Sequence, residues 1–75
     1  MERAAALRLL RILVARGLGS DAPLADAMIE RSALQAGMDD EFSAARNYAL
    51  RQGWLVNVAA GWSKLSPAGH SLAQA

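Results

Sequence analysis

The stretch Gly53–Gly69, GWLVNVAAGWSKLSPAG, contains the clearest change of pattern in this chain of 75 residues. Two short runs rich in β-forming residues, Trp54–Val58 and Trp62–Leu65, are separated by three small residues that end in Gly61. Because glycine readily takes the positive φ angle that a tight hairpin demands, this spacing is typical of two antiparallel strands joined by a short turn. The stretch therefore predicts a β-hairpin near the C-terminal end.

The residues that follow the second run predict a short final helix. Ser66 is a suitable N-cap and Pro67 suits the first helical position, so we expect a helix over about Pro67–Gln74. Within the hairpin, Leu55 and Leu65 are the candidates for the core-facing side.

The first of three helices predicted before the hairpin is Glu2–Arg16, which Gly17 ends. Its apolar residues form two rows at three- and four-residue steps. The larger row consists of Leu7, Leu10, Leu13 and Val14, and the smaller row, on roughly the opposite side, consists of Ala5, Leu9 and Ile12. One helix of so small a domain rarely buries both sides by itself, so the smaller row needs either the C-terminal helix or another molecule as its partner.

The second predicted helix runs from about Pro23 to Ala36 and ends at Gly37. We expect four of its apolar side chains to face inward: Leu24, Met28, Ile29 and Leu34.

The third predicted helix opens with Asp39-Asp40-Glu41 and closes at Gly53. Acidic side chains in a first turn complement the positive end of the helix dipole, and we expect Glu41 to pair with Arg46 inside the domain. Phe42, Ala45 and Ala49 mark the buried side of this helix, at helical spacing.

The composition is that of one small globular domain covering residues 1–75. Hydrophobic residues make up 53% of the chain, which suffices for a packed core, and the absence of cysteine excludes disulfides and thiolate metal clusters. Arginines interrupt the apolar stretches of the first helix, so we expect no membrane span or secretory signal and place the chain in the cytoplasm.

Catalysis and cofactor binding are not expected. His70 is the one histidine, no acid stands near it in sequence, and the chain has no glycine-rich phosphate loop. The acids Asp39, Asp40 and Glu41 have no histidine or cysteine partners at metal-ligand spacing. We therefore expect no enzyme, no metal site and no cofactor.

The order helix, helix, turn, helix, hairpin, short helix resembles that of winged helix-turn-helix domains, as found in small bacterial transcriptional regulators. Leu65-Ser66-Pro67-Ala68-Gly69 resembles the leucine–threonine–x–x–glycine closure of the wing in such regulators, with serine in place of threonine. Ala33 and Gly37 are similar to the small residue and turn glycine of a helix-turn-helix. The resemblance implies a mostly α fold with a two-stranded wing, and a function in binding double-stranded DNA.

The resemblance makes the third helix the recognition helix. Ser43, Asn47 and Arg51 then lie on one outward arc with Asp40. Asparagine can pair with adenine and arginine with guanine in the major groove, and serine can hold a phosphate or a base edge. The wing adds Trp62 and Lys64 as further candidates for DNA contact. The alternatives are a solvated helix face and a tryptophan that covers a cross-strand neighbour such as Val56.

The charge balance supports a second hypothesis, a module that binds protein. Eight basic and seven acidic residues give a net charge of +1, whereas dedicated nucleic-acid binders usually carry a strong positive excess. Ala5, Leu9 and Ile12 would then form a dimer interface or a docking surface on the first helix. The two hypotheses are compatible, because a symmetric dimer doubles the number of phosphates that a small domain contacts.

Overall fold

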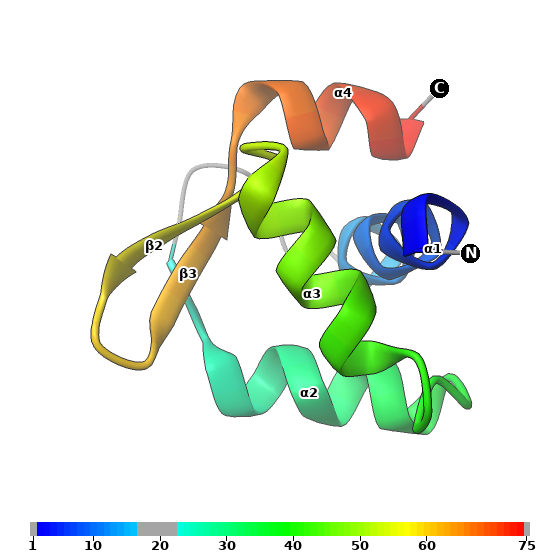
Figure 1. The fold of residues 1–75 in the computed structure, drawn as a ribbon. Coiled ribbons are helices and arrows are strands. Elements are labelled where there is room, and N and C mark those ends of the chain that lie inside the picture. Colours follow the sequence, from blue (N-terminus) through cyan, green and yellow to red (C-terminus); the bar gives the residue numbers. More distant parts are fainter. Residues whose placement is uncertain (1, 17–22, 75) are drawn as a thin grey trace.

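The computed structural model describes residues 2–16 and 23–74, which form a mostly helical fold with a small antiparallel sheet (Figure 1). In chain order the elements are α1 (Glu2–Ala15), β1 (Leu24–Ala25), α2 (Asp26–Gln35), α3 (Phe42–Arg51), β2 (Leu55–Ala59), β3 (Trp62–Leu65) and α4 (Pro67–Gln74). In Figure 1, α3 crosses the front of the molecule with α2 below it and α4 above it, and the β2–β3 hairpin extends to the left. None of the described helices is long and apolar enough to cross a bilayer.

The predicted hairpin and final helix are confirmed, and the sheet has one more strand than predicted. The strand order is β1-β3-β2, with Leu55 opposite Leu65 and Val56 opposite Lys64. Gly61 has a φ angle of +78°, as a tight turn requires. Leu24 pairs with Ser63 in the added strand β1.

The predicted start of the second helix at Pro23 is wrong. α2 begins at Asp26, because Leu24 and Ala25 are extended and pair with β3. Ile29 and Ala33, one helical turn apart, are the fully buried side chains of α2. Met28 and Leu34, which were expected to face inward, are 51% and 45% exposed because they lie off this row.

The third helix begins at Phe42 instead of Asp39, so the three acids precede it. A Schellman-type turn ends α2 before this start: Met38 N–H donates to the Ala33 carbonyl at 2.9 Å and Gly37 N–H to that of Leu34 at 3.0 Å. The same motif closes α3, where Trp54 N–H donates to Ala49 at 2.9 Å.

Gly53 permits the turn that closes α3. Its φ angle of +76° is in the left-handed region, which side chains with a β-carbon rarely adopt. The chain reverses at this residue, and Trp54 is thereby directed into the core. The predicted end of the third helix at Gly53 is confirmed.

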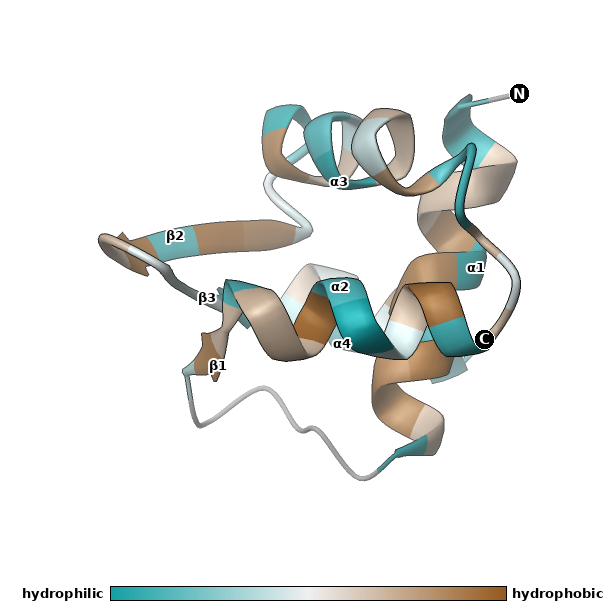
Figure 2. Cartoon of the chain, turned by 90° about the horizontal axis from the view of Figure 1, so that it is seen from below, coloured by the Kyte–Doolittle hydropathy of each residue, from teal (hydrophilic) through white to brown (hydrophobic). Residues whose placement is uncertain are grey.

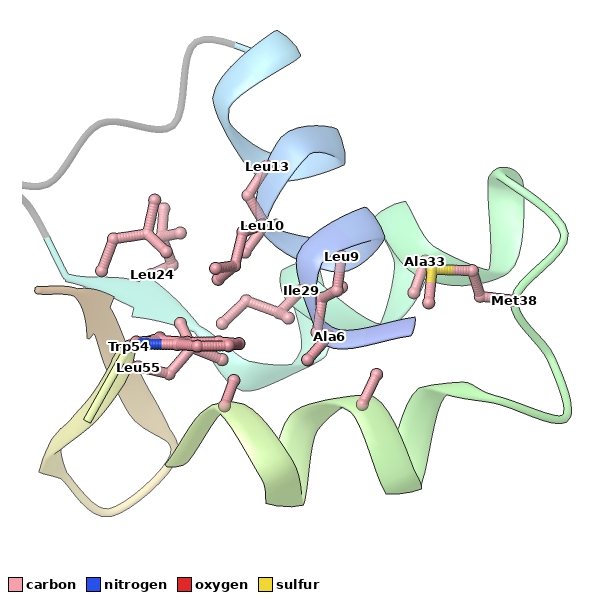
Figure 3. Packing of buried hydrophobic residues seen from close by; sticks show 13 residues of the cluster. Ala6, Leu9, Leu10, Leu13, Leu24, Ile29, Ala33, Met38, Trp54 and Leu55 are labelled. Carbon is pink, nitrogen blue, oxygen red and sulfur yellow. The ribbon is translucent and has the colours of Figure 1, made fainter. Parts of the chain in front are cut away.

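The core lies between α1, α2, α3 and the hairpin (Figure 3). Leu9, Leu10 and Leu13 of α1 are fully buried, and Ile29, Leu55 and Leu65 complete the cluster of large aliphatic side chains. Leu55 and Leu65 therefore face the core as predicted. Phe42 is half-buried at the margin of the cluster, while Ala45 and Ala49 are fully buried.

Both sides of α1 pack within the monomer, so Leu9, which was expected at a dimer interface, lies in the core instead. Leu9 has no exposed surface, and Ala5 and Ile12 are half-buried against the core. α3 and α4 both lie against α1. Because Leu9 is covered by its own chain, it is unavailable to a second molecule.

The final helix docks on the backbone of Trp54. Ser66 N–H donates to the Trp54 carbonyl at 3.0 Å, and the Ser66 hydroxyl accepts a hydrogen bond of 3.1 Å from Gly69 N–H, which confirms the predicted N-cap. A β-carbon at Gly69 would overlap the Trp54 carbonyl oxygen. The serine and the glycine of the Leu65–Gly69 stretch are thus both needed to close α4 onto the rest of the fold.

Candidate nucleic-acid interface

The outward face of α3 presents the three side chains that sequence analysis assigned to it. Ser43, Asn47 and Arg51 are exposed at four-residue spacing, while Ala45 and Ala49 on the opposite side of the helix are fully buried. Figure 1 shows that α3 lies at the front of the molecule beside the hairpin, and α2 and α4 leave this side of it uncovered. The face is therefore available to a partner along its length.

Arg51 is held at the edge of this face by weak contacts. Its guanidinium lies 3.6 Å from the Glu2 carboxylate and 5.7 Å from the centre of the Tyr48 ring. The side chains of Arg51 and Glu2 are 62% and 57% exposed. Ion pairs of this exposure contribute only about 0.2–1 kcal/mol, so a phosphate or a base edge can compete for the guanidinium.

Arg46 points to a different partner from the one predicted. Its Nη2 lies 3.4 Å from Oδ2 of Asp26, at the first position of α2, whereas Glu41 lies 3.5 Å from Arg8. The predicted pair between Glu41 and Arg46 is therefore wrong. The reason is the later start of α3, which leaves Glu41 in the preceding turn beside α1.

Arg8 connects α1 to the turn between α2 and α3. One of its nitrogens donates to the Ala36 carbonyl at 3.0 Å and another contacts Glu41. A cation beside the last carbonyls of a helix is favoured by the helix dipole. Arg8 thus stabilises the turn that sets the direction of α3, a role that no local sequence pattern indicated.

The outer face of the β2–β3 hairpin is largely apolar. Trp62, Val56 and Val58 are 48%, 39% and 42% exposed, and Lys64, half-buried, is opposite Val56. Figure 2 shows β2 coloured as hydrophobic along most of its length. The cross-strand neighbours of Trp62 are Ala59 on β2 and Ala25 on β1 rather than Val56, so two small side chains leave much of the indole uncovered.

An open groove lies between the start of α1 and the start of α3, away from the β2–β3 hairpin. It has a volume of about 450 Å³, and Ala5 and Ala44 form part of its apolar lining. Glu2, Asp40, Glu41 and Arg8 stand around these alanines. Ala5 is thus the member of the predicted interface row that borders a free surface.

Within residues 2–16 and 23–74 no group of three or more histidine or acidic side chains is arranged to hold a metal ion. Comparisons of the chain with protein-family models, with curated proteins and with solved structures found no match. What the chain does is therefore inferred from its own residues and their geometry.

Proposed function

We propose that the chain is a winged helix that contacts double-stranded DNA, with α3 as the recognition helix and the β2–β3 hairpin as the wing. The observation that carries the proposal is the exposure of Ser43, Asn47 and Arg51 on one uncovered face of α3. The exposed Trp62 and the neighbouring Lys64 on the adjacent hairpin extend this surface. The element order and the docking of α4 through Ser66 and Gly69 agree with the resemblance described above.

The chemistry of this surface suits a duplex. The Asn47 amide offers a donor NH2 group and an acceptor oxygen, which together match the major-groove edge of adenine, and the Arg51 guanidinium matches that of guanine. The Ser43 hydroxyl and Lys64 are suited to phosphates, which fix the register of a protein on DNA without reading its sequence. Trp62 has enough exposed ring to lie against a sugar.

The charge balance predicts weak binding by one copy. The net charge is +1, and three arginines form ion pairs with Glu2, Asp26 and Glu41. Acidic residues thus offset most of the positive charge that could displace counterions from DNA. We propose that a homodimer supplies the missing phosphate contacts, through a surface that excludes the buried Leu9.

The function is tested by replacing Asn47 and Arg51 together with alanine. We expect the affinity for a labelled mixed-sequence duplex to fall, because the change removes a cation and a hydrogen-bonding amide from the surface that meets the duplex. The matched control is R31A/Q35A, which removes the same two chemical groups at the same spacing from exposed positions of α2. Equal binding by N47A/R51A and the parent, with both folded, would show that α3 is not the recognition helix.

The second candidate function is self-association through the groove between α1 and α3. It is favoured by the lining alanines Ala5 and Ala44, since small side chains allow a partner to approach closely. Sedimentation over a range of concentrations measures it. If the parent dimerises and Ala44→Glu remains monomeric with unchanged circular dichroism, the groove is the interface. A dimer that A44E leaves intact excludes this surface.

A further inference from the structure

Three elements of the fold meet at the carboxylate of Asp26. Asp26 is the first residue of α2, Arg46 reaches it from α3, and Ser63 reaches it from β3. The Ser63 hydroxyl donates to Oδ1 at 2.9 Å, and Nη2 of Arg46 lies 3.4 Å from Oδ2. Asp26 N–H also donates to the carbonyl of Gly61, in the hairpin turn, at 2.9 Å. Asp26 therefore connects the recognition helix and the wing of the proposed DNA-contacting surface.

Each oxygen of the Asp26 carboxylate has its own partner. Ser63 is 1% exposed, so its hydroxyl needs a protein acceptor, and Oδ1 provides one. Oδ2 remains for the guanidinium of Arg46, which keeps several of its N–H donors for other acceptors. The negative charge at the start of α2 is in addition favoured by the helix dipole. These contacts hold Asp26 in place beside Arg46.

The Arg46–Asp26 pair is less exposed than the other two ion pairs described above. The side chains of Arg46 and Asp26 are 28% and 30% exposed, against 50% each for Arg8 and Glu41 and about 60% for Arg51 and Glu2. Water and salt screen a half-buried pair less than an exposed one. Arg51 is consequently free to turn towards DNA. Arg46, one position from the outward Asn47, stays paired with Asp26.

We propose that Asp26 is a positioning residue that withholds Arg46 from DNA phosphates and so limits the charge contacts of the recognition helix. This inference rests on the proposed function and adds a specific role for Asp26 within it. Arg46 joins α3 to α2 through Asp26, which in turn contacts the wing through Ser63, and base-edge contacts are left to Asn47 and Arg51. Removing the carboxylate charge frees a guanidinium at the margin of the DNA-facing surface, and binding then gains a phosphate contact that carries no sequence information.

Asp26→Asn tests the proposal, because the amide oxygen of asparagine can still accept the hydrogen bond from Ser63 while the charge that holds Arg46 is lost. The measurement is the slope of log affinity against log salt concentration for a mixed-sequence duplex. We expect D26N to have a slope steeper than that of the parent by about 0.9, the value for one additional phosphate. We expect R46Q alone and D26N/R46Q to have the parent slope, since neither has a freed Arg46.

Asp39→Asn is the matched control, because it removes the same charge from an exposed position with no ion pair to another described residue. If Asp26 had only a structural role, D26N would lower stability, and any change in the salt slope would not depend on the presence of Arg46. Equal slopes for D26N and the parent overturn the role of Asp26 while leaving DNA binding established.

The role of Asp26 is also overturned if the steeper slope persists in D26N/R46Q or if D39N reproduces it. Absence of binding by the parent and by D26N at low salt overturns both proposals, and binding by D26N alone supports the role of Asp26.

Discussion

The absence of a side chain at Gly69 allows α4 to close onto the fold. The backbone of Trp54 occupies the space that a β-carbon at this position would need, and α4 is already anchored there through Ser66. Backbone atoms cannot move aside as a flexible side chain can, so the helix itself must shift. Closure of the fold thus depends on the small size of Gly69 as well as on the contacts of Ser66.

We therefore predict that Gly69→Ala destabilises the protein, although alanine has the higher helix propensity. The expected loss is about 1–3 kcal/mol, the usual cost of overpacking, measured by urea denaturation. Ser71→Ala, at an exposed position of the same helix, is the control and should change stability by less than about 0.5 kcal/mol. A G69A protein as stable as the parent would mean that α4 does not pack on Trp54 as described.

Leu9 and Ile12 have different environments, although both belonged to the predicted interface row. Leu9 is fully buried and Ile12 is half-buried. We predict that Leu9→Ala lowers the free energy of unfolding by about 2–5 kcal/mol, because a buried leucine leaves a cavity. Ile12→Ala should cost clearly less by the same denaturation measurement. Equal costs would contradict the assignment of Leu9 to the monomer core.

Helices and strands whose ends are marked by residues adjacent in sequence were predicted well. The hairpin turn at Gly61, the end of α3 at Gly53 and the start of α4 at Ser66-Pro67 each depend on residues adjacent in sequence. The start of α2 could not be predicted, because Leu24 and Ala25 become a strand only by pairing with β3, almost forty residues later. Two residues are also too few to show a periodicity.

The same distinction applies to the candidate site. The exposure of Ser43, Asn47 and Arg51 follows from helical periodicity alone, and the structure agrees with it. The partner of Arg46 depends on how α2 and α3 cross, so the sequence pointed to the nearby Glu41 instead of Asp26. Pairs of side chains from elements distant in sequence can be predicted only when the tertiary structure is known.

The wing permits a prediction of its own. Lys64 is the one charged residue of the hairpin, so Lys64→Gln should lower the slope of log affinity against log salt by about 0.9, the contribution of one phosphate. Arg31→Gln, an equal loss of charge at an exposed position of α2, should leave the slope unchanged. A slope that K64Q does not alter would mean that the wing does not approach the DNA backbone.

The whole molecule combines an uncovered helix face, a projecting apolar hairpin and a nearly balanced charge. Two of its arginines make contacts between elements of the fold: Arg8 connects α1 to the α2–α3 turn, and Arg46 connects α3 to α2. The chain is therefore unlike a basic module that binds nucleic acid through excess charge. It is expected to bind a duplex weakly as one copy, through a small number of phosphates and the side chains of α3.

The measurement that tests this account most directly is binding of the parent protein to a labelled mixed-sequence duplex, followed by fluorescence anisotropy at low and at near-physiological salt. The account predicts binding at low salt that weakens as salt rises, with a slope corresponding to a few phosphates per copy. No binding at low salt, by a protein that circular dichroism shows to be folded, would contradict the assignment of α3 and the hairpin to DNA. The groove between α1 and α3 would then be the surface to examine for a protein partner.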